Sequence, residues 1–319
     1  MGRKKMILDL DTGIDDAMAI AYALASEEID LIGIVGSYGN LQMLDGVQNS
    51  LNLLSLLGQP NIPVYLGEKH SMTTQTFNTM QISQEIHGMN GIGDITIPKS
   101  DQSPHPGSGI DFMIDSAKKF QSDLIIVPTG PLTNLALAIK QSPEIETLIG
   151  KVVLMGGALT IPGNVTPVAE ANINQDPEAA NEVFQSKLTI TMVGLDVTLK
   201  TLLTKKETQE WRQFNSTSSR AFADIVDYYI EAYANLKTNL DGCALHDPLA
   251  VAVAIDSSLV TTLPINMKVD TKSPFSGRTI GDERRLNSNE ATTDVAVAVE
   301  AERFLSIFMT KLSTLFSKN

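Results

Sequence analysis

Short apolar runs alternate with longer segments of helical period along the first two thirds of the chain. The runs are rich in Ile, Val and Leu and have the length of buried strands: Met6–Leu8, Leu31–Val35, Pro63–Leu66, Leu124–Val127, Val152–Met155 and Thr189–Val193. The helical segments that lie between and after them are Asp15–Ala25, Leu41–Leu57, Ile110–Phe120, Pro131–Gln141 and Pro177–Gln185. Strands that alternate with helices predict βαβ units, and therefore a mainly parallel, Rossmann-like central sheet flanked by helices.

The pattern changes in two other parts of the chain. The polar stretch from Gly67 to Gly107 predicts a long loop, and loops of this length in a compact domain are usually functional or disordered. The C-terminal part is predicted to be largely helical, over Thr204–Asn235, Asp247–Ile255 and from Ala301 onward, with late strands Ile265–Val269 and Val295–Val299 extending the sheet. No linker-like segment divides the chain, so we expect a single α/β domain over residues 1–319.

Composition narrows the classes of function. A net charge of −13 argues against a protein that binds nucleic-acid phosphates or an anionic membrane surface. The single cysteine, Cys243, excludes an intrachain disulfide. The basic start "MGRKK" is followed by only three apolar residues before Asp9, too few for a signal peptide. The sequence therefore predicts a cytoplasmic protein.

Four aspartates fall within eight positions, in the segment "DLDTGIDD": Asp9, Asp11, Asp15 and Asp16. They lie at the carboxyl end of the first predicted strand and the start of the next helix, where open α/β sheets bind ligands. A helix N-cap explains one aspartate, not four, because like charges at this spacing repel unless a cation lies among them. Oxygen ligands without sulfur favour calcium or magnesium.

Other motifs follow in order along the chain. "DLDTGIDDAMAI" (Asp9–Ile20) resembles the amino-terminal signature of the inosine–uridine-preferring nucleoside hydrolases, written DxDPGxDDAxAI. "VPTGPLTNLALA", "NVTPVAEANINQDPEAA" and "LHDPLAVA" each resemble a further block of this family of ribonucleoside hydrolases, as do "GN" at Gly39–Asn40 and "HGMNGIG" at His87–Gly93. The resemblance spans essentially the whole chain.

The resemblance implies calcium-dependent hydrolysis of the N-glycosidic bond of ribonucleosides to free base and ribose, in nucleoside salvage. Calcium would be held by Asp11, Asp16, Asp247 and the backbone carbonyl of Thr129. Asp11 would also act as the catalytic base, and His246 would assist the departing base. The remaining implied substrate-binding residues are Asp15 at the ribose 2′-hydroxyl, Asn40, His87, Asn164, Glu170 and Asn172. A homodimer or homotetramer is implied for the assembly.

The chain departs from the family pattern at two positions. Thr12 replaces the proline after the second aspartate, and Ala171 replaces the aromatic residue between Glu170 and Asn172. The only tryptophan, Trp211, lies in a charged helical segment, which argues against a purine site built from two indoles. We therefore expect a pyrimidine or mixed inosine–uridine preference.

Two other functions stay open at this point. A metal-dependent phosphohydrolase could use Asp9 as its nucleophile, since "DLDTG" begins like the DxDx[TV] motif, although Gly13 occupies its fifth place. A nucleoside- or ribose-binding protein could keep the metal without turnover. The presence of both Asp11 and His246 argues against that second alternative.

Overall fold

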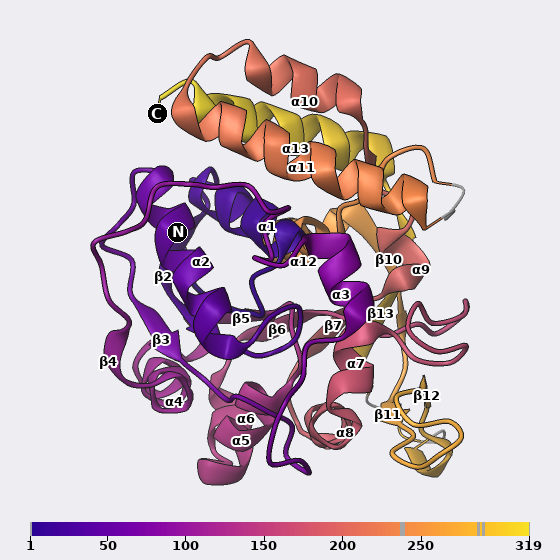
Figure 1. Cartoon of the computed structure of the whole chain (residues 1–319). Helices are drawn as coiled ribbons and strands as arrows, with labels where there is room; N and C mark the ends of the chain where they lie inside the picture. Colours follow the sequence, from indigo (N-terminus) through magenta and orange to yellow (C-terminus); the bar gives the residue numbers. More distant parts are fainter. Residues whose placement is uncertain (1, 237–239, 286–287, 289–290, 319) are drawn as a thin grey trace.

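Nine strands form the central sheet in the computed structural model, which describes residues 2–236, 240–285, 288 and 291–318 (Figure 1). In spatial order they are β10 (Val260–Pro264), β13 (Thr293–Val299), β7 (Ile190–Val193), β6 (Lys151–Met155), β5 (Leu124–Pro128), β1 (Lys4–Leu10), β2 (Ile29–Gly36), β3 (Val64–Leu66) and β4 (His105–Ser108). All neighbouring strands are parallel except β10, which pairs antiparallel with β13.

The chain reverses its direction of travel across the sheet at β1. Strands β2, β3 and β4 extend the sheet on one side of β1, whereas β5, β6 and β7 extend it on the other side. Asp9 of β1 lies in register with Pro128 of β5. In open α/β sheets the crevice beyond the carboxyl ends of two such strands is the usual ligand site.

Side chains that alternate along the strands divide the core between the two faces of the sheet. In β1, Met6 and Leu8 belong to one buried cluster, whereas Ile7 belongs to the other. The first cluster is covered by α1 (Ile14–Leu24), α2 (Met43–Leu56), α11 (Thr217–Asn235), α12 (His246–Ile255) and α13 (Ala301–Phe316). The second cluster is covered by α4 (Gly109–Phe120), α5 (Thr133–Gln141), α6 (Ile145–Leu148) and α8 (Pro177–Gln185), which lie together at the bottom of Figure 1.

Shorter elements connect these layers. Four more helices are α3 (Gln81–His87), α7 (Ala171–Gln175), α9 (Leu195–Thr198) and α10 (Lys205–Arg212), and 3₁₀ turns cover Gln121–Asp123, Ser257–Leu259 and Glu283–Arg285. Two small antiparallel sheets pair β8 (Leu202–Leu203) with β9 (Cys243–Ala244) and β11 (Met267–Val269) with β12 (Thr279–Gly281). No helix in the described ranges combines the length and apolar character needed to cross a membrane.

The predicted α/β class with its mainly parallel, helix-flanked sheet is confirmed, and each of the six early strands and five early helices forms within two residues of its expected ends. Two predictions are wrong. Ile265–Val269 does not extend the central sheet, because β11 pairs only with β12. The expected loop from Gly67 to Gly107 contains α3 and β4. The domain limits 1–319 stay a prediction, and residues 1 and 319 lie outside the described ranges.

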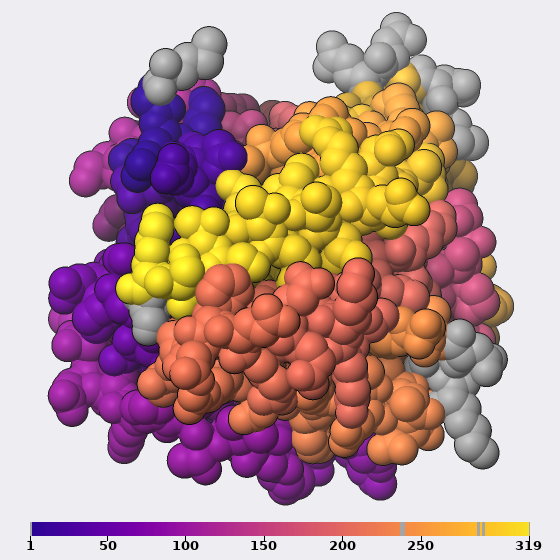
Figure 2. Space-filling model, turned by 90° about the horizontal axis from the view of Figure 1, so that it is seen from above, coloured from indigo at the N-terminus to yellow at the C-terminus, as the bar shows by residue number. Residues whose placement is uncertain are grey.

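The C-terminal helix α13 closes the first face of the sheet. In the view of Figure 2, α13 (yellow) lies between the N-terminal part of the chain and the helices α10 and α11. Its fully buried Phe308 stacks on Tyr22 of α1, with ring centroids 5.9 Å apart and an interplanar angle of 13°. The same ring lies 6.2 Å from Trp211 of α10. Phe308 therefore joins α13 to α1 and α10, and Trp211 is part of this core.

We expect Phe308→Ala to lower the free energy of unfolding by about 3–5 kcal/mol, because it leaves a cavity between three helices. Phe214→Ala is the matched control, since 38% of Phe214 is exposed, and it should cost less than about 1 kcal/mol. Urea unfolding followed by circular dichroism measures both values. Equal losses would show that Phe308 does not hold α13 in place.

Candidate functional site

The four clustered aspartates lie where β1 ends and α1 begins. Asp9 is part of β1, Asp11 follows it directly, and Asp15 and Asp16 form the first turn of α1. All four side chains are buried. The Gly13 N–H donates to Asp16 Oδ2 at 2.8 Å, so this carboxylate caps its own helix. A helix N-terminus favours negative charge, which explains one carboxylate at this position but not the other three.

A fifth carboxylate and a hydroxyl reach the same place from distant parts of the sequence. Thr129 follows β5, the neighbour of β1, and its Oγ1 donates to Asp16 Oδ1 at 2.6 Å. Asp247 lies in the first turn of α12, which packs on α1. Asp15, Asp16 and Asp247 each offer a carboxylate oxygen, and these oxygens lie within 4.8 Å of one another.

Burial and mutual repulsion make these carboxyl groups hard to ionise. Burial raises the pKa of Asp9 to about 7, and it raises the pKa values of Asp15 and Asp16 to about 6, with the charge of Asp15 adding to the shift of Asp16. The pKa values of Asp11 and Asp247 are raised well above the ordinary range, first by burial and then by neighbouring aspartates. Within the described residues no lysine or arginine forms an ion pair with any of the five.

The donor set fits a hard metal cation. The buried Oδ1 of Asp15 and Oδ2 of Asp9 have no hydrogen-bond partner in the part of the chain that the structure describes. A cation beside these carboxylates would supply the missing partner for Asp15 and offset the repulsion. Oxygen atoms without sulfur suit calcium or magnesium better than zinc. The cluster is therefore suited to hold a divalent cation.

Only two of the four expected metal ligands belong to this group of carboxylates. Asp16 and Asp247 are in it, together with Asp15, which we expected at the substrate. The Asp11 carboxylate accepts from Asn40, at 2.7 Å from the backbone N–H and 3.3 Å from Nδ2. The Thr129 carbonyl accepts from Asn172 Nδ2 at 2.7 Å, which leaves one of its two lone pairs free.

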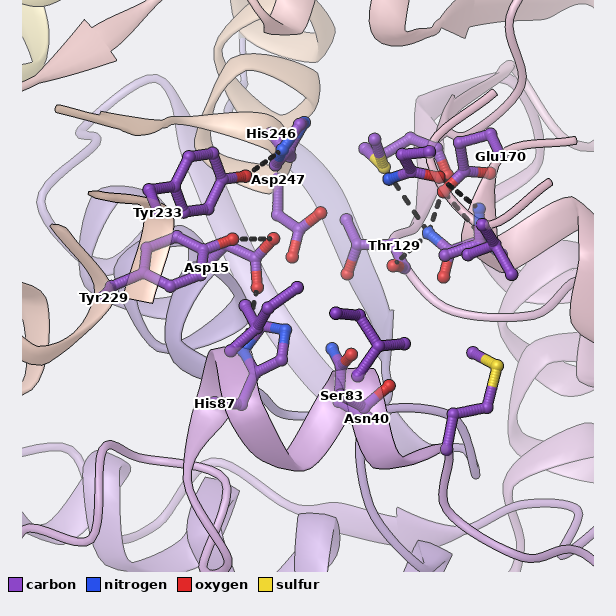
Figure 3. Close-up of a pocket in the computed structure, with 18 of the residues that line it drawn as sticks. Asp15, Asn40, Ser83, His87, Thr129, Glu170, Tyr229, Tyr233, His246 and Asp247 are labelled. Atoms are coloured by element: carbon purple, nitrogen blue, oxygen red, sulfur yellow. Dashed lines mark hydrogen bonds and ion pairs between the residues drawn. The ribbon is translucent and has the colours of Figure 1, made fainter. Parts of the chain in front are cut away.

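A cavity of about 510 Å³ opens over the cluster, within the size range of small-molecule sites. Figure 3 shows the side chains of Asp15 and Asp247 pointing into it, with Tyr229 and Tyr233 side by side along one wall. Its polar lining includes all six expected substrate-binding residues: Asp15, Asn40, His87, Asn164, Glu170 and Asn172. The lining also includes six apolar side chains, which we call the apolar wall: Met80, Ile82, Ile86, Leu199, Leu236 and Leu240. A lining that combines polar and apolar side chains suits a ligand that combines a sugar with a ring.

Glu170 and its neighbours form a polar part of the lining beside α7. The Glu170 carboxylate accepts from three backbone N–H groups, those of Gly157, Asn172 and Ile173, at 2.9–3.2 Å. These bonds fix the carboxylate as the N-cap of α7 and offset part of the pKa rise that burial causes. Asn164 accepts from the Ala171 N–H at 3.0 Å. Ala171 lines the cavity, where the expected aromatic side chain would reduce its space.

The two histidines of the cavity are buried and neutral. His87 ends helix α3 instead of lying in a loop, and its Nδ1 accepts from the Ile14 N–H at 3.1 Å. His246 has Tyr233 Oη 2.7 Å from Nε2 and Thr198 Oγ1 2.7 Å from Nδ1. Burial lowers the pKa of each imidazole to about 4. At pH 7 both rings can donate a hydrogen bond, but neither carries a positive charge.

Tyr229 and Tyr233 of α11 also line the cavity. Tyr229 donates to Asp15 Oδ2 at 3.3 Å, whereas Tyr228 lies against Gly93 outside the cavity. Sequence reasoning missed Thr198 and the apolar wall. The wall could have been found from spacing alone, because 82, 83, 86 and 87 share one face of α3 and 229, 233, 236 and 240 recur every three or four residues.

Comparison with known proteins identifies the family of the chain. Residues 6–306 match the family described as inosine-uridine preferring nucleoside hydrolase. The chain is 34% identical to the pyrimidine-specific ribonucleoside hydrolase RihA of Salmonella gallinarum over 96% of this chain and 97% of that protein. It is 35% identical to the probable uridine nucleosidase 2 of Arabidopsis thaliana, over 97% and 98%. The solved purine-preferring ribonucleoside hydrolase from Gardnerella vaginalis is 56% identical, with a TM-score of 0.98 over 99% of this chain and 100% of that one.

The raised carboxyl pKa values predict that the metal-free protein loses stability as pH rises from about 4 to 7. In this range the folded protein keeps protons on carboxyls that the unfolded chain releases near pH 3.8, so the free energy of unfolding falls. His87 and His246 have the opposite effect on the free energy of unfolding, because below pH 6.5 the unfolded chain protonates them while the folded protein keeps them neutral. The contribution of these two imidazoles is smaller than that of the five carboxyl groups.

Thermal unfolding in excess chelator should therefore give a lower Tm at pH 7 than at pH 5. Adding calcium at pH 7 should raise the Tm, because a ligand that binds only the folded state stabilises it. A Tm that rises from pH 5 to pH 7 in chelator would contradict this account of the buried aspartates.

Proposed function

We propose, from the premise that the chain belongs to the inosine-uridine preferring nucleoside hydrolase family, that it is a calcium-dependent, purine-preferring enzyme of nucleoside salvage. The family hydrolyses the N-glycosidic bond of ribonucleosides, and the chain is a hydrolase of this kind. The observation that carries the proposal is the buried carboxylate cluster at the floor of a cavity whose lining includes the apolar wall. A cytoplasmic location and a homodimer or homotetramer stay predictions.

Calcium is proposed at Asp11, Asp16, Asp247 and the carbonyl of Thr129. The carboxylate oxygens of Asp15, Asp16 and Asp247 within 4.8 Å, the unpartnered Asp15 Oδ1 and the free lone pair of the Thr129 carbonyl support an oxygen-rich calcium site. When bound, calcium would lower the pKa of the attacking water and would hold both this water and the ribose hydroxyls in place. Asp15 is proposed to accept a hydrogen bond from the 2′-hydroxyl, for which its unpartnered Oδ1 is suited.

Asp11 is proposed to accept the proton of the attacking water at its carboxylate. Burial and the charge of Asp16 raise its pKa, and a base with a raised pKa is better matched to work near neutral pH. The backbone N–H of Asn40 holds Oδ2 at 2.7 Å, which fixes the orientation of the group. Asp11 lies directly behind Asn40, a residue of the cavity wall.

The sugar is proposed to occupy the polar part of the cavity. Glycosidic cleavage passes through a transition state in which the sugar resembles an oxocarbenium ion. The carboxylates of Asp15, Asp16 and Asp247 provide negative charge for this cation in a buried, weakly screened site. Asn164 and Glu170 are proposed to bind the 5′-hydroxyl, and Asn172 the ring hydroxyls.

The base is proposed to lie against the apolar wall, beside His246. His246 is neutral at pH 7, so its role would be to stabilise the departing base by donating a hydrogen bond. The sequence favours a pyrimidine or mixed inosine–uridine substrate, but the 56% identity to a purine-preferring hydrolase supports a purine more strongly than 34% identity to a pyrimidine-specific one. Because Trp211 is a core residue, any stacking surface for the purine must come from other side chains.

The alternative of a phosphohydrolase finds no support in the environment of Asp9. Its side chain is fully buried, it is not among the residues that line the cavity, and its Oδ1 accepts from Asn134 Nδ2 at 2.8 Å. A nucleophile must reach the substrate, so Asp9 is suited to support the site from behind. Family membership also argues against a binding protein without turnover.

A panel of ribonucleosides assayed for free ribose tests the proposal. We expect inosine and other purine nucleosides to be hydrolysed with higher kcat/KM than uridine or cytidine. Removing metal with chelator should abolish release, and calcium should restore it. Faster cleavage of uridine would contradict the base preference, and full activity in protein shown by elemental analysis to be metal-free would contradict the calcium site.

Asp11→Asn should lower kcat by about 10²–10⁴-fold, the range for loss of a general base. Asp9→Asn is the matched control: it makes the same change two residues away and should cost less, because Asp9 is bonded to Asn134, away from the cavity, whereas Asp11 is bonded to Asn40 of the cavity wall. Steady-state kinetics with inosine, at saturating calcium, measures both. Equal losses, or a larger loss for Asp9→Asn, would contradict the assignment of Asp11 as the base.

A further inference from the structure

His246 has hydrogen-bond partners at both ring nitrogens, and only one of them lines the cavity. Tyr233, on the Nε2 side, is part of the cavity wall. Thr198, on the Nδ1 side, is the last residue of α9, is fully buried and is not among the lining residues. Figure 3 shows His246 with its bond to Tyr233 on the cavity side. Thr198 therefore contacts the imidazole from behind.

The hydroxyl of Thr198 determines which nitrogen of His246 carries the proton. Among the residues that the structure describes, Nδ1 of His246 is the only hydrogen-bond partner of Thr198 Oγ1. A buried hydroxyl proton needs an acceptor, so Thr198 donates and Nδ1 accepts. An Nδ1 that accepts this bond carries no proton, so the one N–H of the ring belongs to Nε2 and points toward Tyr233 and the cavity.

We infer that Thr198 is a positioning residue for the hydrolysis, because its hydroxyl holds His246 in the Nε2–H tautomer, with the N–H on the cavity side of the ring, toward Tyr233. The inference rests on the proposed function and assigns a role to a residue that does not touch the substrate. With the opposite tautomer, His246 would present a lone pair to the cavity and could not donate to the base.

The scaffold holds Thr198 and His246 at a fixed separation. The Asp196 carboxylate on α9 accepts from the Leu159 and Thr160 N–H groups at 2.9 and 2.7 Å, which ties α9 to the loop after β6. The Leu245 N–H donates to the Thr201 carbonyl at 2.9 Å, which ties the residue before His246 to the segment after α9. Because main-chain bonds set the spacing, the 2.7 Å contact does not depend on the two side chains alone.

The kinetic test compares Thr198→Val with Thr198→Ser on two substrates. Inosine needs help for its departing base, whereas nitrophenyl riboside has a leaving group that departs unaided. Thr198→Val keeps the shape but removes the hydroxyl, and we expect it to lower kcat on inosine by about tenfold or more and on nitrophenyl riboside by less than about threefold. Thr198→Ser keeps the hydroxyl and should restore inosine turnover to within about threefold of wild type.

Thr201→Val is the matched control. It removes another buried threonine hydroxyl from the same segment, one that donates only to the Thr198 carbonyl, at 2.9 Å. It should leave the ratio of the two kcat values unchanged. Equal losses on both substrates for Thr198→Val, or failure of Thr198→Ser to restore inosine turnover, would overturn the inference, because a purely structural role predicts these results.

A second readout does not depend on turnover. ¹⁵N spectra of histidine-labelled protein, with the His246 signal identified among the four histidines by comparison with His246→Gln, report the tautomer directly. We expect Nε2–H in the wild type and in Thr198→Ser, and loss of this single form in Thr198→Val. An Nδ1–H signal in the wild type would overturn the inference. If the wild type released ribose from no nucleoside, the proposed function would fail, while the spectrum would still decide the tautomer.

Discussion

The burial of five carboxyl groups in one small volume, with no ion pair to a lysine or arginine among the described residues, is the constraint on which the site depends. Charges in a weakly polarisable interior repel strongly and are poorly solvated, so each group relies on nearby donors, protons or a cation. The protein supplies one or two donors for each of four, while Asp15 Oδ1 and Asp9 Oδ2 stay without a hydrogen bond within the described chain. A fold that only had to be stable would not gather these residues: Asp9, Asp11, Asp15, Asp16 and Asp247.

The topology of the sheet makes this gathering possible. Strand β1 and the turn into α1 carry four of the groups to the point where the chain reverses across the sheet, and the adjacent β5 brings Thr129 beside them. Helix α12 packs on α1 and adds Asp247 from the C-terminal part. The two apolar clusters on the faces of the sheet hold these elements rigidly, so the repulsion does not separate them.

Hydrogen bonds from the scaffold also control the two neutral histidines. In His87 the backbone N–H of Ile14 binds Nδ1, and in His246 the hydroxyl of Thr198 does. Each ring is thus held at Nδ1, and its N–H belongs to Nε2. A site that places fixed N–H donors beside a cluster of negative charge is suited to separate a sugar cation from a base that leaves with its bonding electrons.

The sequence by itself determined the alternation of strands and helices, the position of the aspartates at a strand end and the family. These follow from local patterns: apolar periodicity, and carboxylates at spacings that only a ligand site explains. The separation of β11 from the central sheet was not predictable in this way, because the strand that pairs with it lies further along the chain.

Only the tertiary structure decided how the site is arranged. It grouped Asp15 with Asp16 and Asp247, directed Asp11 toward Asn40, and used Glu170 to cap α7. It also placed Thr198 behind His246, which lies 48 positions later in the chain. Burial of both imidazoles lowers their pKa values to about 4, so that they are neutral at pH 7. Which oxygen faces which donor depends on distances between segments remote in sequence, and burial sets the protonation state. Neither the pairing of these groups nor their protonation state can be predicted from the order of residues alone.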